Sequence, residues 1–471
     1  MSENPLAPPR LRFPTDASAL VERIWPSSAT RTDDGALVVG GMTADDLVEQ
    51  YGTPLYVVDE HDVQARAVRV RTAFTEAFER IGTRAHVYYA AKAFFTTHVA
   101  GWMAAADLRL DVCTAGELAV ALAAGVDPAR TGFHGNDKSD AEIDLCVRVG
   151  VGTIVLDSHE EIGRVARAAA AAGTVQRVRI RINSGVHAST HEYLATARED
   201  QKFGIPLTEA VQAAEAVRAE PSLAFVGLHS HIGSQIFEES GFREAARRLM
   251  DVHATLVATG PVPELNLGGG WGIDYTEADA AFAPEDVAEA LATIVAEACT
   301  ERDIPVPEIA VEPGRYIVGP AGITLYRVGT IKPVALETDA GEHATRTYVS
   351  VDGGMSDNAR PALYGAEYTA RLARTSDAPA VLTRVVGKHC ESGDVVVHDE
   401  YLPGDVQRGD LLAVAATGAY CWSLSSNYNH VGRPPVVAVA DGAARILVRG
   451  ETIDDLLARD TGVAPVSGTA R

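Results

Sequence analysis

A lysine surrounded by apolar and aromatic residues is the first position in the chain that could carry covalent chemistry. Lys92 lies in the sequence YYAAKAFF. Apolar surroundings disfavour the ammonium form, so we expect a lowered pKa and an amine that can attack a carbonyl group. Most lysines are solvated surface residues, and only these neighbours favour the reactive interpretation.

A glycine run and a histidine pair offer the parts of an anion site. Gly269 and Gly270 lie in LGGGWG, and glycines let backbone N–H groups approach a phosphate without interference from a Cβ atom. Ser234, in GLHSHIGSQ, adds a hydroxyl. His229 and His231 alternate on a predicted strand, so at most one is expected to face this site, and His231 is nearer the strand end. A tight turn and a core histidine are the simpler alternatives.

An acid and an arginine occur together in EPGR, from Glu312 to Arg315. Adjacent opposite charges usually form an ion pair at a turn. Beside a phosphate site, a carboxylate can instead keep a heteroaromatic nitrogen protonated, which makes the ring a strong electron sink. The HxH pair also suits a metal-dependent hydrolase. That site needs further ligands, and Arg315 would add unwanted positive charge, so we predict no metal.

The elements that must position these residues follow a repeating pattern of strand and helix. From about residue 50 to residue 315, short apolar runs alternate with Ala-rich stretches that carry apolar residues at helical spacing. This pattern predicts a closed (β/α)8 barrel, in which active sites form where the strands end. The alternative is an open doubly wound sheet, but its Gly-rich first turn is missing. The predicted strands span residues 85–91, 108–112, 131–134, 153–156, 177–182, 224–231, 265–267 and 309–311.

The rest of the sequence indicates a second domain. Residues 316–471 contain β-rich segments separated by Gly, Pro and Asp, which is typical of a mainly antiparallel β domain. A strand-like run, GALVVGG at residues 35–41, precedes the barrel. We expect the N-terminal segment 1–49 to join the β domain, and residues 50–315 to form the barrel.

Composition limits the possible partners. With 41 Lys plus Arg against 64 Asp plus Glu, the net charge of −23 repels nucleic acid and anionic membranes. The 5 cysteines include no CxxC pair, which favours a reducing compartment over a disulfide framework. Neither a signal-peptide pattern nor an apolar run of membrane-spanning length is present. We therefore expect a cytoplasmic protein.

The sequence resembles the pyridoxal phosphate (PLP)-dependent decarboxylases of fold type III, which have an alanine-racemase-like barrel. This family includes ornithine, arginine and diaminopimelate decarboxylases. DGGMSDNARPALYGA and GLHSHIGSQ are most similar to the diaminopimelate branch. The resemblance runs from about residue 50 to residue 445, and its other motifs are YYAAKAF, DVCTAGEL, FHGNDKS, THEYLATAREDQKFG, GGGWG, VEPGR, KHCESGD and TGAYCWSLSSNYN.

The resemblance implies PLP as the cofactor and assigns residues to it. Lys92 resembles the lysine that holds PLP covalently, His231 the histidine that stacks on the ring, and Glu312 the acid on the pyridine nitrogen. Ser234 resembles a phosphate ligand, and Tyr420 a residue that touches both cofactor and substrate. The full set of implied cofactor contacts is Lys92, His231, Ser234, Gly269, Gly270, Glu312, Gly314, Arg315 and Tyr420.

The resemblance also implies decarboxylation of meso-diaminopimelate to L-lysine. Arg315, Arg360 and Tyr364 resemble the residues that hold the distal carboxylate, and Glu391 the residue that receives the distal ammonium. An arginine fork matches a carboxylate and would not suit a purely cationic distal group. Cys390 resembles the proton donor to the carbanion. In this family Cys390 and Glu391 come from the neighbouring subunit, so the resemblance implies a homodimer.

Two alternatives stay open at the level of sequence. The same chemistry can act on ornithine, arginine or carboxynorspermidine, or the chain can be a relative that binds PLP without turnover. The segment NSGVHASTHEYL departs from the family pattern near Ala188 to Thr190. This departure bears on substrate specificity more than on the type of reaction.

Overall fold

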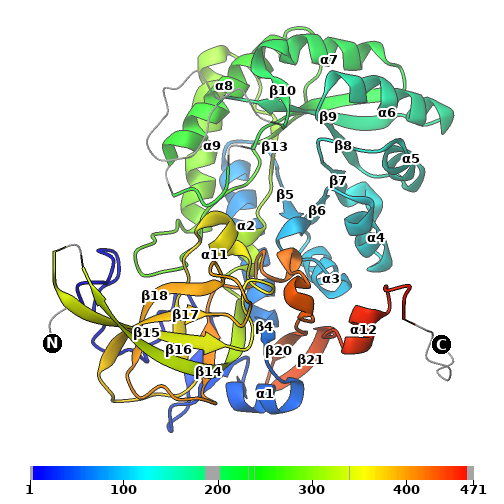
Figure 1. The fold of residues 1–471 in the computed structure, drawn as a ribbon. Coiled ribbons are helices and arrows are strands. Elements are labelled where there is room, and N and C mark those ends of the chain that lie inside the picture. The colour runs from blue at the N-terminus through cyan, green and yellow to red at the C-terminus, as the bar shows by residue number, and fades with distance from the viewer. Residues whose placement is uncertain (1–3, 186–201, 232, 238, 339, 464–471) are drawn as a thin grey trace. The chain divides into compact units, whose positions relative to one another are not determined.

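The structure is a computed structural model that describes residues 4–185, 202–231, 233–237, 239–338 and 340–463 (Figure 1). The chain divides into two compact units. The barrel unit comprises Gln64–Ile273 and Ala280–Ile317, and the β unit comprises the residues up to Val63, Asp274–Asp279 and the residues from Val318 onward. None of the described helices is both long and apolar enough to cross a membrane.

All eight strands predicted for the barrel are present, and each pairs in parallel with its neighbours. The last strand pairs with the first through Ile309 and Ala85, so the sheet closes on itself. A two-residue strand, β10 (Ile205–Pro206), adds to one side. The barrel strands are β5 (Ala85–Ala90), β6 (Arg109–Val112), β7 (Thr131–Phe133), β8 (Thr153–Leu156), β9 (Gln176–Asn183), β11 (Leu223–His229), β12 (Glu264–Asn266) and β13 (Glu308–Val311).

Helices connect the barrel strands, and polar caps fix where several of them begin. Thr114, Ser139 and Ser158 each accept a hydrogen bond from a backbone N–H three residues later, which satisfies a donor that the helix leaves unpaired. The helices are α2 (Glu60–Arg80), α3 (Thr97–Ala105), α4 (Ala115–Ala123), α5 (Asp140–Val149), α6 (His159–Ala171), α7 (Ala210–Ala219), α8 (Glu239–Val257), α9 (Pro284–Arg302) and the short α10 (Arg315–Val318).

The β unit is built on a nine-stranded sheet in the order β18-β17-β15-β14-β4-β20-β21, with β19 on β14 and β16 on β19. Most neighbours are antiparallel, whereas β15 with β17 and β20 with β4 are parallel. Its strands are β4 (Leu55–Asp59), β14 (Gly322–Glu337), β15 (His343–Val351), β16 (Ala370–Leu372), β17 (Ala380–Val386), β18 (Val395–Pro403), β19 (Leu411–Val414), β20 (Val436–Ala440) and β21 (Ala443–Val448).

The N-terminal residues differ in detail from the sequence prediction. The run GALVVGG forms β2 (Leu37–Val39), which pairs with β1 (Thr30–Arg31) and β3 (Met42–Thr43) in a separate small sheet. Leu37 packs in one core with residues of the large sheet, and its N–H donates to Ala373 at 2.7 Å. A barrel boundary at residue 50 is too early, because β4 pairs with β14 and β20 of the β unit.

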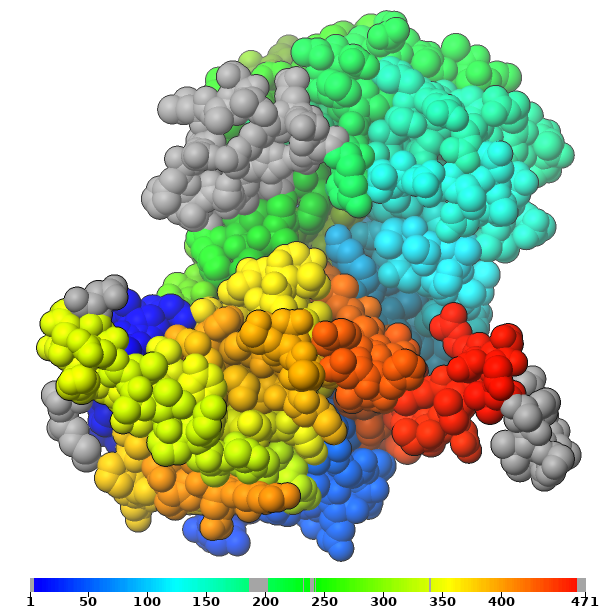
Figure 2. Space-filling view, in the orientation of Figure 1, coloured from blue at the N-terminus to red at the C-terminus, as the bar shows by residue number. Residues whose placement is uncertain are grey.

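Short elements complete the β unit. They are α1 (Ala44–Tyr51), α11 (Arg360–Tyr364), the 3-10 turns η4 (Trp422–Leu424) and η5 (Tyr428–His430), and α12 (Ile453–Leu457). The segment with α12, red in Figure 2, lies on the surface of this unit, and its residues from Ile453 to Val463 are exposed or half-buried.

One face of β9 carries a line of positive charge. Arg177, Arg179 and Arg181 alternate along β9 and therefore share one face of the strand. Arg179 is fully buried, and its Nη2 lies 2.6 Å from Glu264 Oε2. Glu264 also pairs with Arg177. Burial alone would raise the pKa of Glu264, but the two arginines lower it below the ordinary value, which keeps the pair charged.

We expect Glu264→Leu to lower the free energy of unfolding by about 3–5 kcal/mol, because the substitution leaves the buried Arg179 without its counter-charge. Urea unfolding of purified variants measures this. The matched control is Glu285→Gln at the exposed Arg69–Glu285 pair, whose atoms lie 2.8 Å apart; the control should cost less than about 1 kcal/mol. Equal losses in the two variants would contradict the assignment.

Candidate active site

A pocket of about 550 Å³ opens at the end of the barrel where the strands finish. Its walls come from residues at or after the carboxyl ends of β5, β6, β7, β9, β11 and β13. Of the predicted site residues, the pocket brings together Lys92, His231, Ser234 and Glu312. It is further lined by Asp111, Cys113, Glu117, His134, Gly135, Asn136, Asp137, Arg181, Lys202, Phe203, His229 and Gly233.

Lys92 lies in the 3-10 turn η1 (Ala91–Ala93) directly after β5. The expectation that its aromatic neighbours bury it is wrong, since its side chain is exposed at the pocket. Tyr89 and Phe94 are buried instead, and the Tyr89 hydroxyl donates to the Phe94 carbonyl at 2.5 Å. The aromatic residues therefore anchor the turn, and the lysine extends from it.

A buried carboxylate, Glu312, forms the centre of the polar network. Glu312 is 7% exposed. Asn266 Nδ2 donates to its Oε1 at 2.6 Å, and His229 Nε2 lies 3.2 Å from its Oε2. His134 Nε2 lies 3.3 Å from both Glu312 Oε1 and Asp111 Oδ1. Residues at the ends of β6, β7, β11, β12 and β13 thus join in one network through Glu312 and His134.

The protonation of this network is set by burial and mutual charge. Burial would raise the pKa of Glu312, but the interactions with His229 and His134 outweigh it and hold the pKa well below its ordinary value. Burial, with repulsion from Glu312, raises the pKa of Asp111 well above its ordinary value. Burial lowers the pKa values of both histidines. At neutral pH, Glu312 is therefore the ionised carboxylate of the pair, and Asp111 is the one driven toward protonation.

His229 and His231 both line the pocket, so the expectation that at most one would do so is wrong. The reason is that β11 ends at His229, and the alternation of faces does not continue beyond the strand. His231 Nδ1 accepts a hydrogen bond from Gly269 N at 3.3 Å. Burial, assisted by the nearby positive charge of Lys92, lowers the pKa of His231 to about 3. His231 is therefore a neutral ring at physiological pH.

The glycine run after β12 makes a backbone surface that other residues could not form. Gly268 and Gly270 have φ values of 71° and 116°, a region that L side chains rarely adopt. A Cβ on Gly269 would overlap the Glu312 carbonyl oxygen, and one on Gly270 would overlap the Gly233 carbonyl oxygen. The close approach of several backbone segments therefore requires glycine at these positions. An anion cradle has the same requirement, because its backbone N–H groups must reach the anion.

Arg315 and Gly314 follow Glu312 at the end of β13. Arg315 is 9% exposed, and its Nη2 donates to Ser234 Oγ at 2.8 Å. A Cβ on Gly314 would lie 3.0 Å from the Ala90 Cβ. Gly314 thus lets the chain pass close to the strand that precedes Lys92, and Arg315 brings a cation to the Ser234 hydroxyl.

The remaining predicted site residues belong to the β unit. Arg360 begins α11, is 6% exposed, and donates from Nη1 to the Tyr368 hydroxyl at 2.5 Å, while Tyr364 is 70% exposed. Cys390 and Glu391 are exposed on the loop between β17 and β18. Tyr420 is half-buried with a φ of 64°. The departure at Ala188 to Thr190 lies outside the described residues.

Sequence reasoning missed three residues that hold Glu312. The strand predicted over residues 131–134 ends at His134 without assigning it a role, the alternation of faces favours His231 over His229, and Asn266 has no predicted role. A usable signal exists for each of them: all three are polar residues at or directly after the carboxyl end of a barrel strand, where side chains converge on the mouth.

The ligand atoms of His134, His229 and Glu312 also lie within 4.8 Å of one another, close enough to hold a metal ion. Burial is the main cause of the lowered pKa values of both histidines, and the positive charges of Arg181 and Arg179 lower them further. A cation would meet the same repulsion, so the charge of the site disfavours a metal and favours an organic group with an electron-rich or anionic part.

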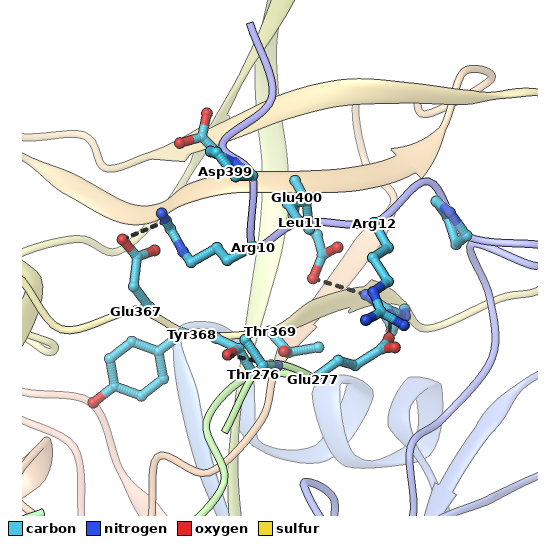
Figure 3. A pocket seen from close by; sticks show the side chains of 14 residues that line it. Arg10, Leu11, Arg12, Thr276, Glu277, Glu367, Tyr368, Thr369, Asp399 and Glu400 are labelled. Atoms are coloured by element: carbon cyan, nitrogen blue, oxygen red, sulfur yellow. Dashed lines mark hydrogen bonds and ion pairs between the residues drawn. The ribbon is translucent and has the colours of Figure 1, made fainter. Parts of the chain in front are cut away.

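A second pocket, of about 370 Å³, lies within the β unit (Figure 3). Its charges are largely paired inside its own wall: Arg10 lies 2.6 Å from Glu367, and Arg371 lies 2.8 Å from Glu400. The described residues that line it include no lysine, cysteine or histidine. The barrel pocket is therefore the better candidate for catalysis.

Comparison with known proteins identifies the family. Residues 62–319 match the family model of the pyridoxal-dependent decarboxylases, pyridoxal binding domain. Diaminopimelate decarboxylase from Mycobacterium tuberculosis is 50% identical over 93% of this chain and 98% of its own length, and that from Bacillus subtilis is 41% identical over 92% and 97%. The crystal structure of diaminopimelate decarboxylase from M. jannaschii in complex with L-lysine is 31% identical, with a TM-score of 0.84 over 93% of this chain and 98% of that one. The chain belongs to the diaminopimelate decarboxylases, within the pyridoxal-dependent decarboxylase family.

Proposed function

We propose that this chain removes one carboxylate of meso-diaminopimelate as CO2 and releases L-lysine, using PLP. The observation that carries the proposal is the barrel pocket, which combines a lysine with an ionised carboxylate and has the glycine run directly behind its residues His231 and Gly233, in a chain 50% identical to a diaminopimelate decarboxylase. The M. jannaschii relative was crystallised in complex with L-lysine, the proposed product.

The pocket residues fit PLP in three respects. Gly269 and Gly270 leave backbone where any side chain would overlap a neighbouring carbonyl, which suits a phosphate cradle. Ser234 and Arg315 add a hydroxyl and a cation next to each other, 2.8 Å apart. Glu312 offers a charged oxygen pair to a ring nitrogen. Bound PLP supplies an electron sink, which accepts the electron pair left when a carboxylate departs from Cα.

Each residue around the cofactor has a distinct task in this proposal. Lys92 extends its amine into the pocket and holds the cofactor covalently. Glu312 stays ionised at neutral pH and keeps a proton on the ring nitrogen. His231 stays neutral, so it stacks on the ring without competing as a cation. Asn266 fixes the Glu312 carboxylate in place.

The β unit supplies the groups assigned to the substrate other than Arg315, which belongs to the barrel unit. The Arg360 guanidinium lies against two aromatic rings, 4.8 Å from the Tyr275 ring centre and 5.6 Å from that of Tyr368. A guanidinium fixed in this way presents its remaining N–H groups as a preformed fork for a carboxylate. Arg315 and Tyr364 complete the carboxylate site, Glu391 receives the distal ammonium, and Tyr420 contacts both substrate and cofactor.

We propose that the enzyme is a homodimer, in which Cys390 and Glu391 complete the active site of the partner. Cys390 then delivers a proton to Cα after CO2 has left. Both residues are exposed in the single chain, and the same unit exposes apolar side chains at Leu363 (60%), Tyr364 (70%) and Tyr428 (41%). Exposed apolar groups of this size are typical of surfaces that a partner covers. The cysteines, all free, suit the reducing cytoplasm.

The first test is the reaction itself. PLP-loaded protein should release lysine and CO2 from meso-diaminopimelate with a kcat/KM at least about a hundredfold above that for ornithine, arginine or carboxynorspermidine. These three substrates lack the second carboxylate, so an arginine of the substrate site would stay without its partner when they bind. Turnover of another amine would keep the cofactor assignment and overturn the substrate. Metal analysis of the same sample tests the hydrolase alternative.

The second test concerns Lys92. Lys92→Ala should lose the visible absorbance of covalently held cofactor after gel filtration, and kcat should fall by more than about a thousandfold, since the covalent attachment that Lys92 provides is lost. Lys202→Ala removes the other lysine in the pocket and should retain the covalently held cofactor. Full absorbance and activity in Lys92→Ala would refute the role.

The third test asks whether two chains share one site. Lys92→Ala and Cys390→Ala should each be inactive, yet subunits exchanged between them should regain about a quarter of wild-type activity, because half of the dimers are mixed and one of their two sites is intact. Mixing Lys92→Ala with Glu312→Gln is the matched control. In this control both substituted residues are ones that each chain contributes to its own barrel pocket, so every site of a mixed dimer carries one substitution and no activity should return. Mixed dimers without activity in the first case would disprove sharing.

A further inference from the structure

The loop that carries Cys390 is held by its own unit through a buried carboxylate. Asp394 is 4% exposed; its Oδ2 accepts from His389 N at 2.8 Å, and its Oδ1 accepts from Met355 N at 2.6 Å. The loop begins at Gly387, where a Cβ would overlap the Asp394 carboxylate. These contacts fix both ends of the loop but leave the Cys390 backbone to be held by another group.

Asn429 is that group. Its Oδ1 accepts a hydrogen bond from Cys390 N at 3.2 Å and lies 3.2 Å from His389 Nδ1. On the other side of the same ring, His389 Nε2 lies 2.9 Å from Ser356 Oγ and accepts from Ser356 N at 3.4 Å. A backbone N–H can only donate, so Nε2 is the acceptor and the neutral ring carries its proton on Nδ1, which donates to Asn429.

The conformation of Asn429 explains why asparagine occupies this position. Its φ is 51°, in the left-handed region that asparagine tolerates better than most residues. In this conformation one amide oxygen reaches both the Cys390 N–H and the His389 ring. Glycine would accept the backbone angle but lacks the oxygen, and aspartate would keep an oxygen acceptor. The position therefore requires a residue that tolerates a left-handed backbone conformation and also carries a side-chain hydrogen-bond acceptor.

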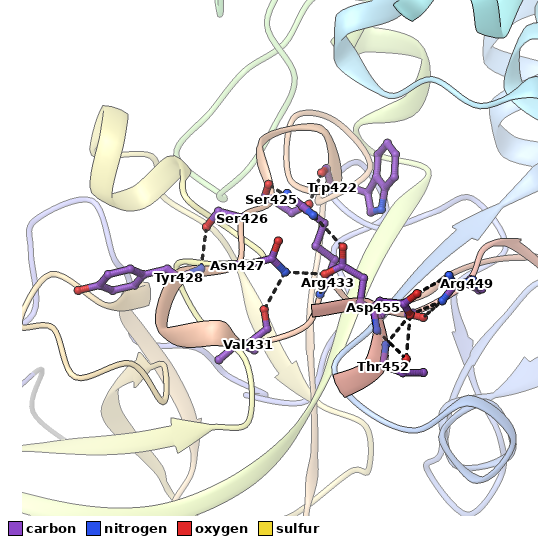
Figure 4. Close-up of polar contacts among 12 residues, drawn as sticks. Trp422, Ser425, Ser426, Asn427, Tyr428, Val431, Arg433, Arg449, Thr452 and Asp455 are labelled. Atoms are coloured by element: carbon purple, nitrogen blue, oxygen red, sulfur yellow. Dashed lines mark hydrogen bonds and ion pairs between the residues drawn. The ribbon is translucent and has the colours of Figure 1, made fainter. Parts of the chain in front are cut away.

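The segment that carries Asn429 is itself anchored (Figure 4). Glu451 Oε2 accepts from Asn427 Nδ2 at 2.5 Å and from Arg433 N at 2.9 Å, and Glu451 Oε1 pairs with Arg433 Nη1 at 2.8 Å. Ser426 N donates to the Ser356 carbonyl at 2.8 Å. Asn429 thus connects the Cys390 loop to a segment tied down at both sides, rather than to a free loop.

We infer that Asn429 is a positioning residue for the reaction, which sets the Cys390 backbone and, through His389 and Ser356, the orientation of the loop that presents the thiol. This inference rests on the proposed role of Cys390 as proton donor. Asn429 holds the N–H of Cys390 itself, whereas Glu391, which is proposed to bind the substrate, is the next residue along the loop, so the loss of Asn429 should lower kcat more than it raises KM.

The experiment compares Asn429→Gly and Asn429→Asp in the PLP-loaded enzyme. We expect Asn429→Gly to lower kcat for meso-diaminopimelate about fivefold, the order expected for the loss of one hydrogen bond, with KM within about twofold of wild type. Asn429→Asp should retain at least about half of kcat, since it keeps the acceptor and tolerates the angle. Backbone amide exchange in the peptide around Cys390 should rise in Asn429→Gly and stay near wild type in Asn429→Asp.

Asp441→Gly is the matched control, because Asp441 also has a left-handed φ, 53°, but lies exposed in the turn between β20 and β21. Its kcat and amide exchange around Cys390 should match wild type. If Asn429→Gly fails to fold, Ser356→Ala replaces it, and the same loss of kcat at constant KM is expected from the other end of the network.

The proton-donor role of Cys390 and the positioning role of Asn429 can be refuted separately. Wild-type kcat in Cys390→Ala would overturn the proton-donor role, and the positioning inference would fall with it. An inactive Cys390→Ala together with wild-type kcat and amide exchange in Asn429→Gly would overturn the positioning inference alone. A rise in KM without a fall in kcat would assign Asn429 to substrate binding instead.

Discussion

An ionised carboxylate inside a protein is costly unless hydrogen bonds and nearby positive charge compensate it, and Glu312 imposes this requirement on the end of the barrel. Asn266, His229 and His134 meet it, and they come from the ends of β12, β11 and β7. A slip of one residue in any of these strands would remove a partner. The charge of Glu312 and the register of the barrel therefore depend on each other.

The same constraint shapes the backbone beside the carboxylate. Glu312 N donates to the Gly268 carbonyl at 2.8 Å, and the Glu312 carbonyl lies where a Cβ on Gly269 would have to be. One arrangement of two neighbouring chain segments thus fixes both the acid and the glycine surface. A cofactor with a ring nitrogen at one end and a phosphate at another would be oriented by both features at once.

The sequence was sufficient to predict features that repeat locally. The eight barrel strands are short apolar runs between helix-forming stretches, and polar residues after them mark the mouth, so fold and pocket followed from pattern and known barrel geometry. Features that depend on distant partners were not predictable in this way. β4 precedes the barrel but pairs through Val58 with Gly322, more than 260 residues later, and this pairing moves the boundary of the unit. The joint presence of His229 and His231 depends on where β11 ends, and periodicity places strand ends only approximately.

The Cys390 loop is held by contacts within its own unit, and the proposed dimer gives a physical reason for this. In the proposed dimer, the loop must act on a substrate bound to another chain, and any freedom left in it would be lost on assembly at an entropic cost. Asp394, His389 and Asn429 remove that freedom within the unit itself, since every contact they make to the loop comes from the same unit. The backbone that carries the thiol is then fixed before a partner docks, which reduces the entropy that the proposed assembly loses.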